Sequence, residues 1–157
     1  GGTASTTTGA GPAWLTTELT DVVTRETFTV AGLAAERPVI LETFAVWCST
    51  CLAQQREMQS FHAAEGDDAA ASLSLNIDPN ESASKVTDHR SEHGFDWHYA
   101  VAPPDVSVSL SNAFGQSVLN PPSAPVIVVC RADSAAASRL RDGVKGADEL
   151  RTAVEDC

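Results

Sequence analysis

The sequence predicts an α/β protein, a three-layer α/β/α sandwich in which one sheet lies between two layers of helices. Three observations predict this class. Two runs, residues 38–46 and 125–130, are rich in β-branched and apolar residues, segments with helical character alternate with strand-like runs, and 157 residues suit one domain. A chain of this size buries roughly two thirds of the surface that it exposes when unfolded, so its core needs no disulfide to form.

The first residues are nearly all Gly, Thr, Ser and Ala. They offer too little apolar surface to offset the entropy of ordering them, so we expect a flexible tether at residues 1–13 and one domain at residues 14–157. The chain has no initiator Met, which is consistent with removal of an upstream targeting segment. Residues 19–23 and 28–30 flank a charged turn and are expected to form an N-terminal β-hairpin.

A β-α-β unit is expected in the middle of the chain. The run 38–46 is typical of a central strand buried on both faces, and good helix formers follow it at residues 49–64. A strand at 72–77, a helix from Asn80 or Ser82 to a stop at Gly94, and a strand at 97–102 complete the unit.

The C-terminal third continues the alternation. A short helix capped by Asp105 and ending near Gly115 precedes the buried strand 125–130. A short edge strand is expected at residues 139–144. A final helix at residues 147–156 places acidic side chains in its first turn, where the helix dipole favours them.

Acidic residues dominate the charge. Ten Lys and Arg against twenty-one Asp and Glu give a formal net charge of −11. Because this charge repels phosphate backbones and no basic cluster offsets it, we expect no nucleic-acid binding. The only lysines are Lys85 and Lys145, a balance that resembles the proteins of salt-loving archaea, with an ordinary acidic protein as the alternative. No apolar run approaches the ~20 residues that span a membrane.

Cys48-Ser49-Thr50-Cys51 lies where the buried strand gives way to a helix. A CxxC pair alone is a weak indicator, since it can hold zinc, close a structural link or exchange electrons. At a helix N-terminus, however, unpaired N–H groups and the helix dipole stabilise a thiolate, so Cys48 is the candidate nucleophile. Cys51, one turn into the helix, can attack a mixed disulfide at Cys48 and is the candidate resolving thiol.

The cysteines and histidines are also candidate metal ligands. Zinc needs two further ligands, but Cys130 and Cys157 have no CxxC partners and His62 lies on the helix after the pair. His89 and His93 stand four residues apart on a predicted helix, where nothing nearby completes a site, so we expect them to lie on a solvated polar face. We therefore expect no metal and no cofactor.

The strand and motif resemble the thioredoxin superfamily. Residues 39–48 align without gaps with the family's strand that enters its active site, and Ala124-Pro125 before Val-Ile-Val-Val fits the position of its cis-proline. An additional α-β-α segment precedes Pro125. With residues 75–78 and 92–97 and the N-terminal hairpin, it resembles the TlpA and ResA-like extracytoplasmic thiol-disulfide oxidoreductases. The resemblance covers about residues 14–156.

This resemblance implies roles for residues around the cysteines. Glu42, six residues before Cys48, matches a buried acid that relays a proton to the resolving cysteine; burial in so apolar a run should raise its pKa. A solvated Glu facing a sheet edge is the alternative. Pro125 would be cis and would let Ala124 pair with an extended substrate strand. Trp47 is expected to shield the thiol and shape the docking surface.

The sequence departs from the family pattern at three positions. Thr50 stands where a proline often precedes the second cysteine, and Gln54 and Arg56 replace an acid and a proline in the helix. Because the residues between the cysteines influence the reduction potential, the direction of electron flow stays open. A peroxiredoxin is disfavoured, since Ala45 stands where its Thr-x-x-Cys motif would need threonine.

The resemblance also bears on the second pair of cysteines. In this fold the strand ending at Cys130 and the last helix ending at Cys157 both run away from the active-site edge, so the two sulfurs should meet at the far end of the sheet. A structural disulfide there would imply an oxidising compartment. A buried apolar Cys130 with a loose terminal thiol is the alternative.

These features predict an extracytoplasmic enzyme, secreted or membrane-tethered and monomeric, that exchanges electrons with protein disulfides or dithiols. An electron donor in a membrane would then reduce it. Two alternatives stay open. The thiols could form the copper site of a metal-handling module, or the 48–51 bond could fix a loop in a redox-inert interaction domain.

Overall fold

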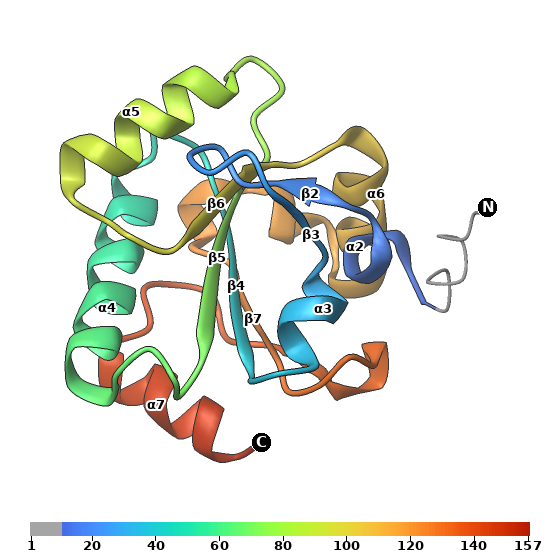
Figure 1. The fold of residues 1–157 in the computed structure, drawn as a ribbon, viewed down its shortest axis with the longest axis vertical. Helices are drawn as coiled ribbons and strands as arrows, with labels where there is room; N and C mark the ends of the chain where they lie inside the picture. The colour runs from blue at the N-terminus through green and yellow to red at the C-terminus, as the bar shows by residue number, and fades with distance from the viewer. Residues whose placement is uncertain (1–10) are drawn as a thin grey trace.

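Five strands form the central sheet of the computed structural model, which describes residues 11–157 (Figure 1). From edge to edge they are β6 (His98–Val101), β5 (Ala71–Asn76), β4 (Val39–Phe44), β7 (Val126–Val129) and β8 (Ala137–Arg139). The strands β4, β5 and β6 are parallel, whereas β7 is antiparallel to β4 and β8 to β7. The predicted three-layer α/β class is confirmed.

Helices cover both faces of the sheet (Figure 1). The helices α2 (Ala13–Thr16), α3 (Val30–Ala34) and α6 (Pro104–Phe114) pack on one face, around a core that includes Trp14, Leu41 and Leu110. The helices α4 (Ser49–Glu65), α5 (Ala83–His93) and α7 (Ala147–Glu155) pack on the other, where the core includes Phe44, Met58 and Leu150. Every residue of β4 is buried because the strand has neighbours on both sides and helices on both faces.

The helix boundaries follow the local sequence. Ser82 accepts a hydrogen bond from the Lys85 N–H and begins α5, and Gly94 ends it at a φ of 71°, as predicted. The predicted Asp105 cap of α6 is wrong: Pro103 precedes the helix and Asp105 lies in its first turn. Proline suits the first helical position, since its fixed φ is helical and it has no N–H to satisfy.

Two predicted strands are shorter or shifted. The hairpin is present as β2 (Leu19–Thr20) and β3 (Thr27–Phe28), but Val30 begins α3 because the Thr29 side chain accepts the Gly32 N–H and caps a helix there. The edge strand β8 ends at Arg139 instead of covering residues 139–144. Gly143, at a φ of 91°, then turns the chain towards α7.

The predicted cis peptide before Pro125 is wrong, since residues 11–157 contain no cis peptide bond. Ala124 follows the turn η2 (Pro121–Ser123) in the left-handed region, at φ 50° and ψ 57°. Its N–H donates to the Pro121 carbonyl at 2.8 Å. This left-handed residue redirects the chain into β7, so the reversal needs no cis bond.

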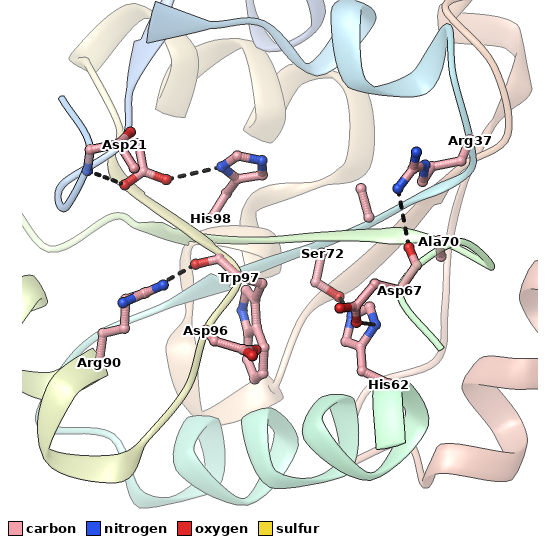
Figure 2. Close-up of a pocket in the computed structure, with 12 residues that line it drawn as sticks. Asp21, Arg37, His62, Asp67, Ala70, Ser72, Arg90, Asp96, Trp97 and His98 are labelled. Carbon is pink, nitrogen blue, oxygen red and sulfur yellow. Dashed lines mark hydrogen bonds and ion pairs between the residues drawn. The ribbon is translucent and has the colours of Figure 1, made fainter. Parts of the chain in front are cut away.

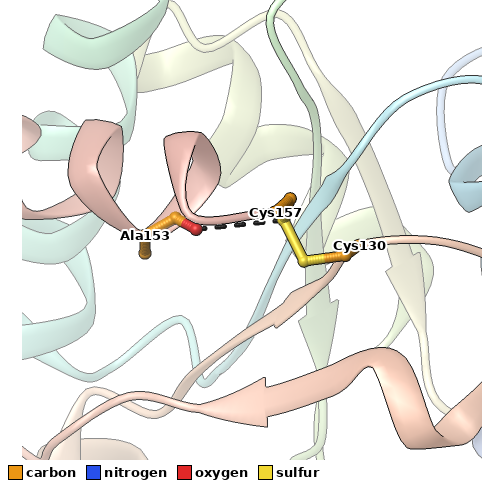
Figure 3. Close-up of a disulfide and its surroundings, with 3 residues drawn as sticks. All are labelled: Cys130, Ala153 and Cys157. Carbon is orange, nitrogen blue, oxygen red and sulfur yellow. Dashed lines mark hydrogen bonds between the residues drawn. A yellow bond between two sulfur atoms is a disulfide. The ribbon is translucent and has the colours of Figure 1, made fainter.

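Cys130 and Cys157 are joined by a disulfide, with their Cα atoms 5.4 Å apart (Figure 3). Cys130 follows β7, whose last residue, Val129, pairs with Val39 at the start of β4. The disulfide therefore lies at the opposite end of the sheet from the cysteines that follow β4.

We expected a tether at residues 1–13, of which residues 1–10 lie outside the described residues. Its last residue, Ala13, begins α2. Between residues 11 and 157, no helix combines the length and the apolar character needed to cross a membrane.

Candidate active site

Cys48 begins the helix that follows the central strand. It is the N-cap of α4, and its Sγ accepts the Cys51 N–H at 3.1 Å. A side-chain acceptor at this position satisfies one of the unpaired N–H groups that open a helix. The same N–H groups and the helix dipole stabilise negative charge, so this sulfur lies where a thiolate is favoured.

Cys51 lies one turn into α4, against the turn η2. Its Sγ donates to the Pro121 carbonyl at 3.3 Å. Burial raises the pKa of the Cys51 thiol, and the negative charge of Glu42 raises it further. Both cysteines are free thiols, and both are buried, with 3% of Cys48 and 1% of Cys51 exposed. The two thiols thus differ, one capping a helix and the other held protonated.

Glu42 lies in the middle of β4 and is completely buried. It pairs with Ser74 on one neighbouring strand and Val126 on the other, so the alternative of a solvated Glu at a sheet edge is wrong. Gln55 Nε2 donates to its two carboxylate oxygens at 3.0 and 3.2 Å, and Ser74 Oγ donates to Oε1 at 2.6 Å. Burial nevertheless raises the pKa of Glu42 to about 8, against the opposing effects of Ser74, Gln55 and Lys145.

A buried polar network extends from this carboxyl. The Gln55 carbonyl oxygen accepts from Tyr99 Oη at 2.7 Å and lies 2.8 Å from His89 Nε2. Trp97 Nε1 donates to Ser74 Oγ at 2.9 Å. The prediction that His89 is solvated is wrong: only 4% of it is exposed. Its spacing of three residues from Val86, the other buried residue of α5, could have indicated this.

Two acidic side chains that follow β5 accept hydrogen bonds from the residues just before Cys48. The Val46 N–H donates to Glu81 Oε1, and Trp47 Nε1 donates to Asp78 Oδ2, each at 2.8 Å. The Trp47 side chain stays on the surface, with 60% of the residue exposed. Glu81 and Asp78 are positioning residues that the sequence analysis missed.

Comparisons with known proteins agree on the architecture. No protein-family model and no curated protein matches the sequence. A thiol:disulfide interchange protein of the thioredoxin family from Chlorobium tepidum superimposes with a TM-score of 0.69 at 15% identity, covering 88% of this chain and 90% of that one. A DsbF homologue from Corynebacterium diphtheriae gives a TM-score of 0.68 at 15% identity, covering 89% and 83%. The chain has the thioredoxin fold.

A third solved structure with the thioredoxin fold is a secreted disulfide oxidoreductase from Mycobacterium tuberculosis, homologous to DsbE of Escherichia coli. Its TM-score is 0.62 at 16% identity, and the match covers 89% of this chain and 95% of that one. Because these identities are low, the comparisons establish the fold alone.

Ala124, to which the resemblance gave a docking role, has its backbone groups engaged within the chain. In a thioredoxin fold this residue would offer backbone groups to a substrate strand, yet here Ala124 is fully buried and its N–H donates to Pro121. Its carbonyl accepts from the Lys145 ammonium. Both backbone groups therefore have partners within the chain, and the pairing of Ala124 with a substrate strand stays a prediction.

Lys145 is an unusual neighbour of the site because it is completely buried. The Gln54 amide holds its backbone from both sides, accepting the Lys145 N–H at 2.8 Å and donating to its carbonyl at 3.0 Å. Burial lowers the pKa of Lys145 to about 8, with the nearby Arg141 charge acting in the same direction. The sequence analysis assigned no role to either Gln54 or Lys145.

The candidate zinc ligands outside the 48–51 pair do not lie near it. His62 lines a separate hollow of about 270 Å³ with Asp67 and Ser72 (Figure 2). Ser72 lies at the start of β5, whereas Cys48 follows the end of the parallel strand β4, so the two sites lie at opposite ends of the sheet. Cys130 and Cys157 bond to one another. No group of three His, Cys, Asp or Glu side chains within residues 11–157 is arranged to hold a metal ion.

Proposed function

We propose that the protein is a thiol-disulfide oxidoreductase that exchanges electrons with disulfides or dithiols of other proteins. The observation that carries this proposal is the placement of Cys48 as the N-cap of α4, just beyond the C-terminal end of the central strand β4, with its sulfur accepting the Cys51 N–H. This placement favours a thiolate at Cys48 and keeps a second sulfur within one helical turn. The family of the superimposed structures supports the proposal.

In the reducing direction, the Cys48 thiolate attacks one sulfur of the substrate disulfide. A mixed disulfide forms at Cys48, and the other substrate sulfur leaves as a thiolate. Cys51 then loses its proton, attacks the Cys48 sulfur and expels the second substrate sulfur. Two electrons pass to the substrate, and a disulfide links Cys48 to Cys51. The oxidising direction is the reverse.

Glu42 is proposed as the acid and base for the proton of Cys51. Burial keeps that thiol protonated, so its attack requires a base, and Glu42 is the carboxyl whose charge acts on it. With a pKa of about 8, Glu42 can accept and return a proton near neutrality. The released substrate thiolate can take up the proton that Glu42 received.

The protein partner is proposed to dock at Trp47. This side chain is the exposed aromatic group next to Cys48, and its bond to Asp78 holds it in place. Aromatic side chains that keep an apolar face exposed are common anchors in protein interfaces. Since Cys48 itself is only 3% exposed, the docked partner must displace the atoms that cover the sulfur before a mixed disulfide can form.

We place the protein outside the cytoplasm, in an oxidising compartment. The Cys130–Cys157 disulfide supports this location, because structural disulfides persist in such compartments and are rare in the cytosol. The Mycobacterium tuberculosis protein of the same fold is described as secreted. An electron donor in the adjacent membrane would re-reduce Cys48 and Cys51 after each turnover.

The proposal is tested by following reduction of insulin disulfides with dithiothreitol as the electron source. The protein should accelerate the reaction, and Cys48→Ser should not. Stoichiometric Cu(I) binding without disulfide reduction would instead favour a copper-handling module. A 48–51 disulfide that resists dithiothreitol would favour a redox-inert interaction domain. Measuring the reduction potential of the pair would then give the direction of electron flow.

Replacing Glu42 should separate stability from turnover. The folded pKa of about 8 exceeds the unfolded value of 4.5, so Glu42 contributes stability below pH 4.5 that is lost as the pH rises to about 8. The loss amounts to about 1.4 kcal/mol per pH unit in this window. Glu42→Gln should therefore melt at a higher temperature than the wild type at pH 8, yet resolve mixed disulfides more slowly. Thermal melts at pH 4.5 and 8 measure the first effect, and equal melting temperatures at pH 8 would contradict it.

A further inference from the structure

We propose that Gln55 is a positioning residue that, together with Ser74, leaves one carboxyl oxygen of Glu42, Oε2, to carry the exchangeable proton. This inference rests on the proposed proton transfer at Glu42 and adds the group that organises it. Gln55 is completely buried on α4, one turn after Cys51, and its side chain lies between Glu42 and two further polar groups.

The two oxygens of Glu42 have different surroundings. Oε1 accepts from Ser74 Oγ at 2.6 Å and from Gln55 Nε2 at 3.0 Å. Within the described part of the chain, Oε2 receives only the longer 3.2 Å contact from the same amide nitrogen. A carboxyl proton occupies the oxygen with fewer donors, because a second donor directed at a protonated oxygen is repelled. The proton of Glu42 therefore belongs on Oε2.

The direction of each donor is determined by the next group in the network. Trp97 Nε1 is a donor only, so the Ser74 oxygen must accept from it and can point its own hydrogen at Glu42 Oε1. Burial raises the pKa of Tyr99, which therefore stays protonated and donates to the Gln55 carbonyl oxygen. His89 Nε2 lies 2.8 Å from the same oxygen. The carbonyl end of Gln55 is thereby held away from Glu42, and its amide nitrogen is held towards it.

Several titratable groups surround this carboxyl and enter its pH dependence. The Glu42 charge raises the pKa of Cys51, which lies on the same helix as Gln55, and the pKa of Tyr99 on β6. The Lys145 ammonium acts on Glu42 from the loop before α7 and favours its ionised form. His89 on α5 reaches Glu42 only through Gln55. Gln55, like Ser74, is uncharged and contacts the carboxyl directly, so replacing it changes the hydrogen bonds and leaves the charges in place.

Gln55→Met tests the inference, because methionine has a similar length and no donor. Without the two amide contacts the ionised form of Glu42 is less stable, so its titration midpoint should rise from about 8 by about one pH unit. If Glu42 accepts the Cys51 proton, resolution of a mixed disulfide at pH 7 should become about tenfold slower, with its pH profile shifted by the same amount. The midpoint is measured from the ¹³C resonance of the Glu42 carboxyl, assigned by its loss in Glu42→Gln.

Gln54→Met is the matched control. Gln54 is equally buried and adjacent on α4, but its amide holds the Lys145 backbone and makes no hydrogen bond to Glu42. This variant should lose stability and shift the Glu42 midpoint less than Gln55→Met does, because it perturbs Lys145 but leaves both contacts from the Gln55 amide in place. The inference is overturned if Gln55→Met leaves the Glu42 midpoint unchanged, or if Gln54→Met shifts it equally.

Tyr99→Phe provides a second test should Gln55→Met fail to fold. It removes one donor to the Gln55 carbonyl oxygen and leaves the amide present, so the Glu42 midpoint should rise by a smaller amount, and an unchanged or lower midpoint would refute the inference. The carboxyl titration also separates the two proposals. A shifted midpoint in Gln55→Met with no change in the resolution rate would support the positioning of Glu42 by Gln55 and reject proton transfer by Glu42.

Discussion

Replacing Cys51 with Ser should stop turnover after one chemical step and leave the substrate bonded to Cys48. The variant keeps the Cys48 sulfur at the N-terminus of α4, where it accepts the N–H of residue 51. Attack on a protein disulfide can therefore proceed, but no second sulfur is present to expel the substrate. When the pre-reduced variant meets excess insulin in the absence of dithiothreitol, we expect about one equivalent of mixed disulfide per protein.

Intact-mass analysis under non-reducing conditions measures this adduct, and dithiothreitol should remove it. Cys48→Ser is the matched control and should give neither adduct nor turnover, since burial holds the Cys51 thiol protonated. Release of the substrate from Cys48 in the Cys51→Ser variant without dithiothreitol would show that Cys51 is not the resolving thiol. An adduct on Cys51 in the Cys48→Ser variant would reverse the assignment of the two sulfurs.

The elements that position the cysteines could be predicted from the sequence. An unbroken apolar run such as β4 is compatible with a strand covered on both faces, and a CxxC pair directly after it marks the start of the next helix. The stop of α5 at Gly94 was equally clear, because the left-handed conformation at a helix end favours glycine. These features depend on neighbours in the sequence and are therefore visible there.

The polar network around Glu42 could not be predicted in the same way. Its members come from β4, β5, α4, α5 and β6, and a polar residue on a helix normally indicates a solvated face. The prediction of a solvated His89 is wrong for this reason. A buried polar group is stable only if partners from other elements satisfy it, and those partners follow from tertiary packing.

The geometry around Pro125 also depended on tertiary contacts. The cis peptide was expected from resemblance alone, whereas Ala124 reaches β7 through a left-handed turn whose carbonyl contacts the distant Lys145. The resemblance gave no indication that this chain carries a buried ammonium there. The docking role expected of Ala124 stays a prediction, whereas the strand that follows it was predicted correctly.

Removing the Cys130–Cys157 disulfide should lower stability strongly and leave disulfide exchange intact. The bond joins residues separated by 27 positions, and a closed loop of this length stabilises a protein by about 3–4 kcal/mol in the chain-entropy model. For a domain of this size, that loss corresponds to a fall in melting temperature of about 10 °C. Exchange should persist at 25 °C because the disulfide lies at the opposite end of the sheet from Cys48.

The double variant Cys130→Ala/Cys157→Ala, compared with the wild type by thermal melting, measures this contribution. Its matched control is Cys48→Ser/Cys51→Ser, in which only the Cys130–Cys157 bond can be reduced. Reductant should lower the melting temperature of the control to near that of the alanine variant, and it should leave the alanine variant unchanged. Equal melting temperatures of the control with and without reductant, once mass analysis shows the bond to be reduced, would mean that loop closure contributes nothing to stability.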